Sequence, residues 1–398
     1  MKNKFAHTTK KMVKPPPLRK GDEVAITAAS GPVEPERLAA GAMVLESLGL
    51  KVKTLYTPRR LSENRPFAYA KSRKTACCRR FFCDFGTACG VFGQSAPSEA
   101  RTIDPPIEVC QANSNHPPKR GDCDTNIAER FNWCRNTSSY LAGPDHQRAQ
   151  NLNAAFADKK IKAIFMARGG YGVTRILPLT DFALIRLNPK ILVGYSDTTA
   201  LHIAVNQLCR LITYHGPMPA ADLFNADSAT ISALEQMLFA ETYPPHPHKI
   251  AGKKLKTLQH GQAKGILTGG NLTMLAASLG TPYEINTRGR ILFMEDIQEE
   301  PYRVDRMLVQ LKLAGKLRDA AGFVLGDFSP ETHETLAAAI QSHLMPEGKP
   351  IIGNFPAGHC VPNITLPLGA MAEISTESSH LFQICGHSGI ATERRRLC

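Results

Sequence analysis

The fold of this protein is decided by one stretch of sequence, Lys190-Ile191-Leu192-Val193-Gly194-Tyr195-Ser196-Asp197-Thr198-Thr199-Ala200-Leu201-His202-Ile203-Ala204-Val205. It opens with a short apolar run, which is typical of a buried strand, and apolar residues with helical spacing follow from Ala200. Ser196 therefore lies where a strand turns sharply into a helix. A hydroxyl at such a turn projects from the carboxyl edge of a sheet, where a helix N-terminus stabilises negative charge. The simpler alternative is that Ser196 or Asp197 only caps the helix.

Strand and helix signals alternate through the first half of the chain. Residues 18–32 predict a turn, a buried strand and a Ser-Gly-Pro loop, residues 34–48 a helix, and residues 52–55 a second strand. Such a β-α-β unit implies parallel strands joined by a right-handed crossover. The pattern resumes with a helix capped by Asp145 and a strand over residues 163–166. We therefore predict a doubly wound α/β domain, Rossmann or flavodoxin-like, with its ligand crevice at the carboxyl ends of the strands.

The second half predicts a smaller domain of mixed α+β type. A buried strand at residues 290–294 ends in Glu295, and a strand at residues 350–353 runs into a Gly-His turn. No internal repeat is present. The predicted boundaries give an N-terminal α/β domain, a linker and a C-terminal domain, at residues 14–222, 223–261 and 262–390.

One segment of the first domain, residues 61–138, has a different character. It has no sustained period of 2 or 3.6, and it carries the only tryptophan, Trp133, and seven of the 11 cysteines. None of these cysteines forms a CxxC pair, so neither a zinc site nor a secreted disulfide framework follows. We interpret the segment as an irregular insertion without a role in the chemistry. The alternative is a small cysteine-rich module that binds a metal.

Length and composition indicate a soluble globular protein of two or three domains, since the chain has 398 residues. The net charge of +13 invites a nucleic-acid partner, but the basic residues are mostly scattered and cluster only at Arg394-Arg395-Arg396. We therefore expect no nucleic acid. Residues 1–20 lack the apolar run of a signal peptide, and no stretch is long enough to cross a bilayer. These features predict a cytoplasmic protein without a membrane span.

A serine hydroxyl becomes a good nucleophile when a base removes its proton and an acceptor holds that base. Of the 13 histidines, His359 is the best placed, because it follows a strand and a glycine turn. His202 lies on the helix after Ser196 and points elsewhere. His215 follows a short strand and remains a rival.

The acid that orients the base is expected at a rigid strand end. Glu295 closes the apolar run 291–294 and is the first choice. Asp296, Glu299 and Glu300 remain alternatives, since all of these carboxylates are equally compatible with a solvated surface.

Six motifs occur together and in order along the chain. They are ARGGYG (Ala167–Gly172), VGYSD (Val193–Asp197), TYHGPM (Thr213–Met218), GGNL (Gly269–Leu272), LFMED with PYRVDRML (Leu292–Leu308), and GHC-x-x-N-x-TLPLGA (Gly358–Ala370). In this combination the chain closely resembles the LD-carboxypeptidases, the muramoyltetrapeptide carboxypeptidases of bacterial murein recycling. The resemblance covers nearly the whole chain except its two ends and the segment 61–138.

The resemblance implies a serine peptidase with a Ser-His-Glu triad. The family's nucleophile falls on Ser196, its triad glutamate on Glu295 and its triad histidine on His359. The oxyanion donors of such enzymes are backbone N–H groups, here those of Asp197 and Gly170. Glycine suits that loop, because a backbone that approaches the substrate closely tolerates no Cβ.

The implied reaction removes the terminal D-alanine from a murein tetrapeptide, and no metal or organic cofactor is called for. A carboxypeptidase also binds the free carboxylate of its substrate, and Arg168 or Arg303 could do so; structural ion pairing is the alternative for both. Since the serine lies in the first domain and its partners in the second, we expect the site at the domain junction. A homodimer is the expected assembly.

Two residues depart from the family pattern. Ala29 stands where proline is usual, and Cys360 stands where glycine is common, next to the proposed base. The first alternative function is that of the microcin-immunity branch, which cleaves an aminoacyl-nucleotide but stacks the base on tryptophan, whereas the only Trp here lies in the insertion. The second is a catalytically impaired, insertion-disrupted homologue that only binds murein peptides.

Overall fold

The structure is a computed structural model that describes residues 11–56, 140–243, 249–250, 253–328, 333–377 and 382–385. The predicted insertion at residues 61–138, with its alternative of a metal-binding module, lies outside these residues. The arginine cluster near the end of the chain lies outside them as well.

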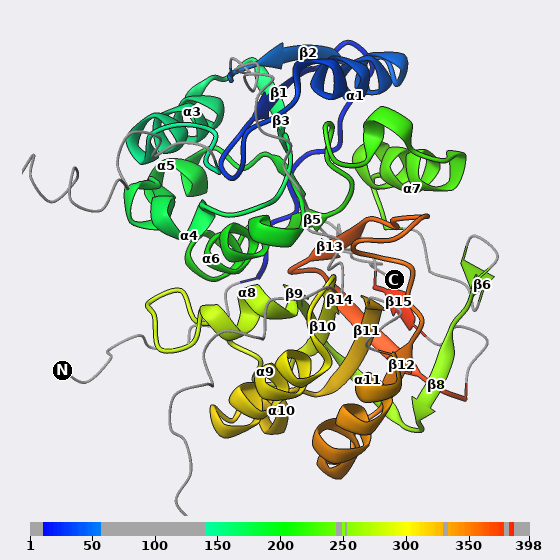
Figure 1. Ribbon diagram of the computed structural model, residues 1–398. Coiled ribbons are helices and arrows are strands. Elements are labelled where there is room, and N and C mark those ends of the chain that lie inside the picture. Colours follow the sequence, from blue (N-terminus) through cyan, green and yellow to red (C-terminus); the bar gives the residue numbers. More distant parts are fainter. Residues whose placement is uncertain are drawn as a thin grey trace, which may run out of the picture. The chain divides into compact units, whose positions relative to one another are not determined.

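In the described part of the chain, the first sheet has six strands in the order β13-β5-β4-β3-β1-β2 (Figure 1). Strands β1 to β5 are parallel to one another, and β13 pairs antiparallel with β5. The strands are β1 (Glu23–Thr27), β2 (Lys51–Thr54), β3 (Ile161–Met166), β4 (Ile191–Gly194), β5 (Thr213–His215) and β13 (Leu366–Leu368). The parallel β-α-β unit predicted at the start of the chain is confirmed.

Helices cover both faces of this sheet. On β1, Ile26 faces the core with α1 and α7, while Ala25 faces the core with α3, α5 and α6, because successive side chains of a strand point to opposite faces (Figure 1). The helices are α1 (Pro35–Ser47), α3 (Asp145–Ala157), α5 (Phe182–Leu187), α6 (Thr199–Cys209) and α7 (Ser228–Phe239), with the short α4 (Val173–Ile176), η1 (Leu177–Leu179), η2 (Ser196–Thr198) and η3 (Leu223–Asn225). This is the doubly wound α/β architecture that the sequence predicts. Asp145 is the first residue of α3 and not its cap, which is Pro144.

The second sheet is mixed and runs β15-β14-β9-β10-β11-β12-β8. Its central strands β9 to β12 are parallel, and its edges are antiparallel. The strands are β8 (Lys256–Gln259), β9 (Gln262–Asn271), β10 (Ile291–Asp296), β11 (Gly322–Phe328), β12 (Ile351–Gly353), β14 (Met371–Ser375) and β15 (Phe382–Ile384). The helices are α8 (Leu272–Ala277), α9 (Pro301–Leu313), α10 (Lys316–Asp319) and α11 (His333–Ala339), followed by η5 (Ile340–Leu344) and η6 (Met345–Glu347). Two short strands, β6 (Lys249–Ile250) and β7 (Lys253–Lys254), pair separately.

The sequence pattern does not predict to which sheet two of the strands, β13 and β8, belong. β13 belongs to the first sheet although it lies in the chain between β12 and β14 of the second, and β8 joins the second sheet from within the predicted linker. Both are short edge strands, and β13 contains Pro367, which is tolerated at a sheet edge. A run of three or four residues is too short for periodicity to assign it to a sheet.

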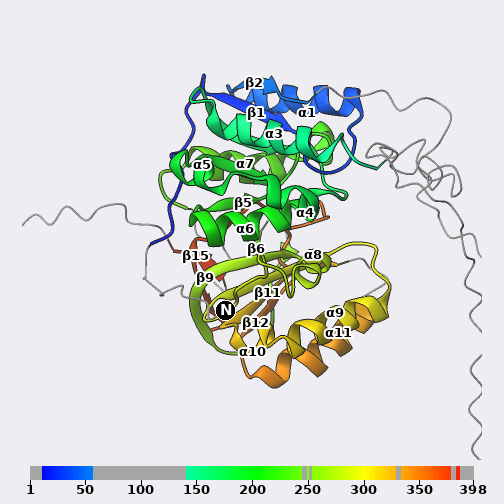
Figure 2. The same cartoon turned by 90° about the vertical axis from the view of Figure 1, so that its left-hand side faces the viewer.

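Helix α6, which follows Ser196, packs against the second sheet and its first helix. Its Ile203 lies in one buried cluster with Leu272 and Leu275 of α8. The hydroxyl of Thr199, at the start of α6, accepts a hydrogen bond from the Asn271 N–H at 3.0 Å. Figure 2 shows α6 above α8 and β9. The turn that bears Ser196 is therefore held by contacts to both sheets.

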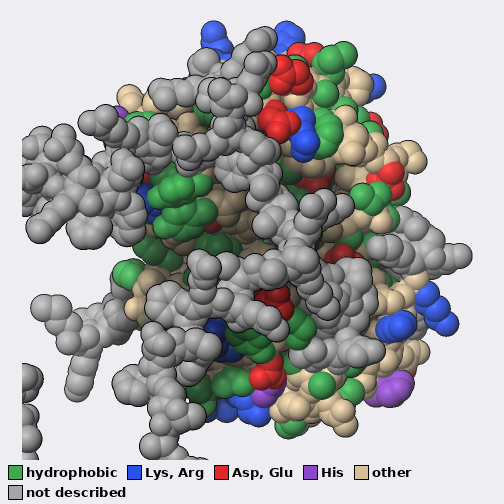
Figure 3. Space-filling view, viewed as in Figure 1, with side chains coloured by type: hydrophobic (Ala, Val, Ile, Leu, Met, Phe, Trp, Pro, Cys, Tyr) green, Lys and Arg blue, Asp and Glu red, His purple; other side chains and the backbone are tan. Residues whose placement is uncertain are grey.

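Basic and acidic side chains are interspersed on the face shown in Figure 3, where the described surface is visible. The charged side chains that are visible in this view form no broad region of a single sign. Among the described residues, no helix combines the length and the apolar character needed to cross a membrane.

Candidate active site

Ser196 lies on a strained turn between β4 and α6. Its φ angle is +60°, in the left-handed region that residues other than glycine rarely adopt. The chain leaves the sheet at Gly194, passes through η2 and enters α6 with Thr198 as its N-cap. Neither Ser196 nor Asp197 caps α6 with its side chain, so the capping alternative is wrong. Strain of this kind concentrates at functional sites.

The loop Ala167–Gly172 runs against the Ser196 side chain. A Cβ atom on Gly169 would stand 2.8 Å from the Cβ and 2.9 Å from the Oγ of Ser196, so only glycine allows the backbone to come so close. The next residue, Gly170, has a φ angle of +121°. Its N–H has no acceptor within the described ranges, and the Asp197 N–H lies in the first turn of η2, where a helix supplies no acceptor.

Alternation along β10 separates its two carboxylates. Phe293 faces the core shared with the first sheet, whereas Met294 faces the core with α8 and α9. Glu295 therefore points to the same side as Phe293, and Asp296 points to the same side as Met294. Asp296 accepts hydrogen bonds from Asn271 Nδ2 and from the N–H and hydroxyl of Thr273, so it holds the start of α8.

Glu295 contacts His359. The side chain of Glu295 is fully buried, and its Oε2 lies 2.8 Å from His359 Nδ1. A Cβ on Gly358 would stand 2.5 Å from the same Oε2, and Gly358 has a φ angle of +110°. The glycine before the histidine therefore makes room for the carboxylate. Asn363 Oδ1 accepts a hydrogen bond from the Gly358 N–H at 3.1 Å and holds this turn.

The pKa of His359 is raised. Burial alone would lower it, but the hydrogen bond and charge of Glu295 outweigh that effect, with further help from the charges of Asp296 and Asp222. Because Nδ1 faces the carboxylate, Nε2 is the nitrogen left for another partner. The imidazole also packs edge-on against Tyr195, the neighbour of Ser196, with ring centroids 4.8 Å apart. The structure thus brings His359 to the turn that bears Ser196.

The rival histidines have different surroundings. His215 is buried between Tyr195 and Phe293, and within the described residues neither ring nitrogen has a hydrogen-bond partner. Burial lowers its pKa well below the usual value, with smaller contributions from the charges of His202 and His359. His202 Nε2 lies 2.7 Å from the Gly194 carbonyl oxygen. Among the described residues, neither histidine has a hydrogen bond or ion pair with a carboxylate.

A Tyr-Asp pair beside the imidazole was not predicted. The Tyr195 hydroxyl donates to Asp222 Oδ1 at 2.8 Å, and the Met218 N–H donates to Asp222 Oδ2 at 2.9 Å. This pair fixes the ring against which His359 packs. Both residues lie in or beside the VGYSD and TYHGPM motifs, but spacing alone does not show that they meet.

The two arginines predicted to bind a carboxylate differ in their partners. Arg303 on α9 is half-exposed and lies 3.7 Å from Glu299 Oε2. Arg168 precedes Gly169, donates to the Pro32 carbonyl at 3.2 Å, and has no carboxylate partner in the described part of the chain. Arg168 therefore differs from Arg303 in having no ion pair among the described residues, and it directly precedes the glycine that packs against Ser196.

Two regions of the chain match known domains. Residues 95–216 match the LD-carboxypeptidase N-terminal domain and residues 264–374 the LD-carboxypeptidase C-terminal domain. The protein belongs to the LD-carboxypeptidase family. As a member of this family it is a serine-type carboxypeptidase, as its sequence motifs predict.

A relative agrees with this assignment, and solved structures share the fold. A Bacillus subtilis protein described as "Probable murein peptide carboxypeptidase" is 43% identical over 249 residues, which are 61% of this LD-carboxypeptidase and 77% of that protein. The muramoyltetrapeptide carboxypeptidase of Oxalobacter formigenes has a TM-score of 0.62 at 24% identity, covering 91% of this chain and 97% of that one. An MccF-like protein from Bacillus anthracis has a TM-score of 0.67 at 23% identity, covering 94% and 100%. These structures share the two-domain α/β fold.

Proposed function

We propose that this LD-carboxypeptidase acts in the cytoplasm on murein tetrapeptides in peptidoglycan recycling, removing the D-alanine that is joined to an L-configured centre. The observation that carries the proposal is the pair of Glu295 and His359, 2.8 Å apart, packed against the turn that bears Ser196. The 43% identity to a protein described as a murein peptide carboxypeptidase supports the substrate class.

Acylation uses the three side chains in sequence. His359 Nε2 takes the proton of Ser196 Oγ while Glu295 holds the imidazole through Nδ1. The alkoxide attacks the carbonyl carbon, and the tetrahedral oxyanion is bound by the N–H groups of Asp197 and Gly170. The imidazolium then protonates the amine of the departing D-alanine. No hydrogen bond joins Ser196 Oγ to His359 within the described residues, and such contacts tighten when substrate binds.

Deacylation repeats the steps with water. Nε2 of His359 takes a proton from water, the hydroxide attacks the acyl carbon, and Ser196 leaves with the proton returned by the imidazolium. The products are the tripeptide-bearing fragment and free D-alanine. Each step uses groups of the chain itself and a water molecule.

The direct test is mass spectrometry of a murein tetrapeptide incubated with the purified full-length protein. We expect the peptide to lose one alanine, with D-alanine released in equal amount. Binding without loss of alanine would support the impaired homologue. Cleavage of an aminoacyl-nucleotide with no action on the tetrapeptide would support the microcin-immunity function.

Arg168 is proposed to bind the terminal carboxylate of the substrate. A charge-assisted hydrogen bond of this kind contributes about 1.5–3 kcal/mol, so Arg168→Gln is expected to raise KM about 10- to 100-fold. The same variant should change little for a tetrapeptide amide, which lacks the charge. Steady-state kinetics with both peptides measures this. The same selective loss in Arg303→Gln, and not in Arg168→Gln, would transfer the role to Arg303.

A further inference from the structure

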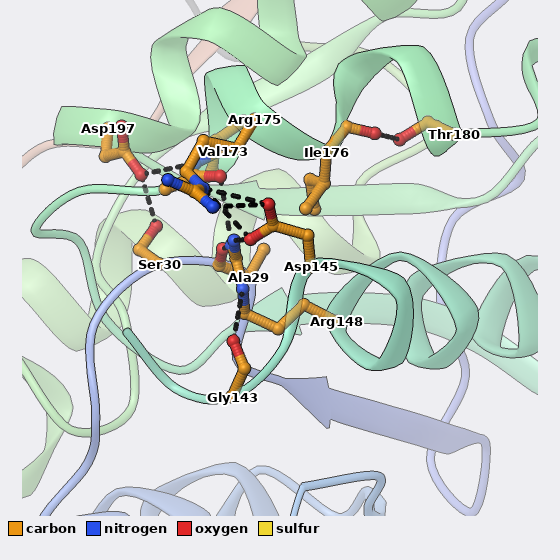
Figure 4. A network of polar contacts seen from close by, with 11 residues as sticks. Ala29, Ser30, Gly143, Asp145, Arg148, Val173, Arg175, Ile176, Thr180 and Asp197 are labelled. Atoms are coloured by element: carbon orange, nitrogen blue, oxygen red, sulfur yellow. Dashed lines mark hydrogen bonds and ion pairs between the residues drawn. The ribbon is translucent and has the colours of Figure 1, made fainter. Parts of the chain in front are cut away.

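The side chain of Asp197 joins three segments around the nucleophile turn. Only 1% of this residue is exposed, and its Oδ2 accepts hydrogen bonds from Ser30 Oγ at 2.6 Å and from the Val173 N–H at 2.9 Å (Figure 4). Ser30 lies in the loop after β1. Val173 begins α4, directly after the loop Ala167–Gly172. A single carboxylate oxygen therefore ties both loops to the residue that follows Ser196.

A buried arginine holds the same two loops from the other side. Arg148 on α3 is 2% exposed, and its Nη1 donates to the carbonyl oxygens of Ala29 and Gly172 (Figure 4). The Gly172 carbonyl and the Val173 N–H belong to one peptide group. That peptide therefore has a guanidinium on its oxygen and a carboxylate on its N–H. A charge at each end of a peptide dipole strengthens both hydrogen bonds.

The surroundings keep both charged groups in place. Burial raises the pKa of Asp197 to about 6, opposed by the hydrogen bonds from Ser30 and Val173 and by the charge of Arg148, so the carboxyl is mostly ionised at neutral pH. Arg148 is paired with Asp145, whose two carboxylate oxygens also share a bifurcated hydrogen bond from Arg175 Nε–H.

We propose that Asp197 is a positioning residue that sets the separation of the two oxyanion N–H groups. Its own N–H is one donor, and its carboxylate fixes Val173, three residues after the other donor, Gly170. The inference rests on the proposed function, since it assumes that these two N–H groups bind the oxyanion. Arg148 completes the arrangement by holding the Gly172–Val173 peptide against the carboxylate.

The test compares two buried hydroxyls of similar setting. Ser30→Ala removes the hydrogen bond to Asp197, whereas Thr180→Val removes a 2.9 Å bond to the Ile176 carbonyl at the other end of α4 (Figure 4). A misplacement of about 1 Å costs on the order of 100-fold in rate, so Ser30→Ala is expected to lower kcat roughly 10- to 100-fold with KM unchanged. Thr180→Val is expected to lower Tm and keep kcat. Equal kcat in Ser30→Ala and the wild type would overturn the proposal.

A second variant and a second probe make the outcome independent of folding and of the substrate. Asp197→Asn keeps an acceptor oxygen but removes the charge, and we expect it to lower kcat as Ser30→Ala does, with KM unchanged. A fluorophosphonate forms a P–O bond to the serine oxygen and releases fluoride, and its rate reports the nucleophile and oxyanion hole without murein peptide. Slow labelling of Ser30→Ala and Asp197→Asn supports the inference when the Tm of each variant equals that of the wild type. This holds even if no D-alanine is released. The proposal is contradicted if the labelling rate falls only as far as Tm falls, and if Thr180→Val shows the same proportion between the two.

Discussion

Ser196→Ala is expected to lower kcat for D-alanine release by about 10⁶-fold, the usual cost of removing a serine nucleophile. The loss is this large because the acyl intermediate can no longer form. Stability should change little, since alanine meets the same restriction at a φ of +60° as serine and fills nearly the same space. The measurements are kcat from D-alanine release and Tm from circular dichroism, with covalent labelling by a fluorophosphonate as a direct reporter of the nucleophile.

Ser278→Ala is the matched control. The Ser278 hydroxyl is buried, whereas Ser196 is partly buried, and it donates to the Leu275 carbonyl at 2.8 Å at the end of α8. We expect this variant to lose some stability and to retain both kcat and labelling. Normal D-alanine release by Ser196→Ala would mean that another nucleophile, such as water activated by His359, performs the reaction.

The strands and turns that carry the site can be predicted because their signals are local. The apolar run before Gly194 and the helical spacing after Thr199 require only neighbouring residues to indicate a strand, a turn and a helix. Glu295 is predicted for the same reason, as the residue that closes an apolar strand. Its separation from Asp296 follows once β10 is known to have cores on both faces.

The contacts that position the site cannot be predicted in this way. Arg148 stands among polar residues near the start of α3, where an arginine is normally a surface residue. Its hydrogen-bond acceptor Ala29 is 119 residues away in the chain. The contact between Tyr195 and Asp222 is likewise set by how β4 and the segment after β5 meet. Such pairings depend on tertiary packing, which a single sequence does not display.

Glu295→Gln is expected to lower kcat about 10⁴-fold, the cost of losing the carboxylate that holds a catalytic histidine in its productive tautomer. Glu295 Oε2 lies 2.8 Å from His359 Nδ1, and we expect that contact to hold the proton on Nδ1 and so leave Nε2 unprotonated. A glutamine can offer its NH₂ group instead and favour the wrong tautomer. The buried Oε1 of Glu295 has no partner in the described residues, so the fold should tolerate the neutral side chain.

The same variant should shift the pH dependence of the remaining activity. Glu295 raises the pKa of His359, and only the neutral imidazole can act as a base, so wild-type kcat/KM falls as the pH decreases through that raised pKa. Removing the charge lowers the pKa of His359, and the acid limb should therefore move to lower pH.

The folded-state pKa of His359 is above its unfolded value. The stability that the pair contributes is therefore present at low pH and lost as the pH rises through the folded pKa. Unfolding at several pH values checks this sign.

Asp296→Asn tests whether strand alternation assigns the two carboxylates correctly. Asp296 is the next residue on β10, but its oxygens bind Asn271 and Thr273 at the start of α8. Asparagine leaves one of these donors without an acceptor, so Tm should fall while kcat at the pH optimum stays near the wild-type value. Only a carboxylate on the His359 face of the strand can hold the imidazole. If Asp296→Asn lost as much kcat as Glu295→Gln at an unchanged Tm, Asp296 would also take part in orienting His359. The assignment of that role to Glu295 alone by strand alternation would then be wrong.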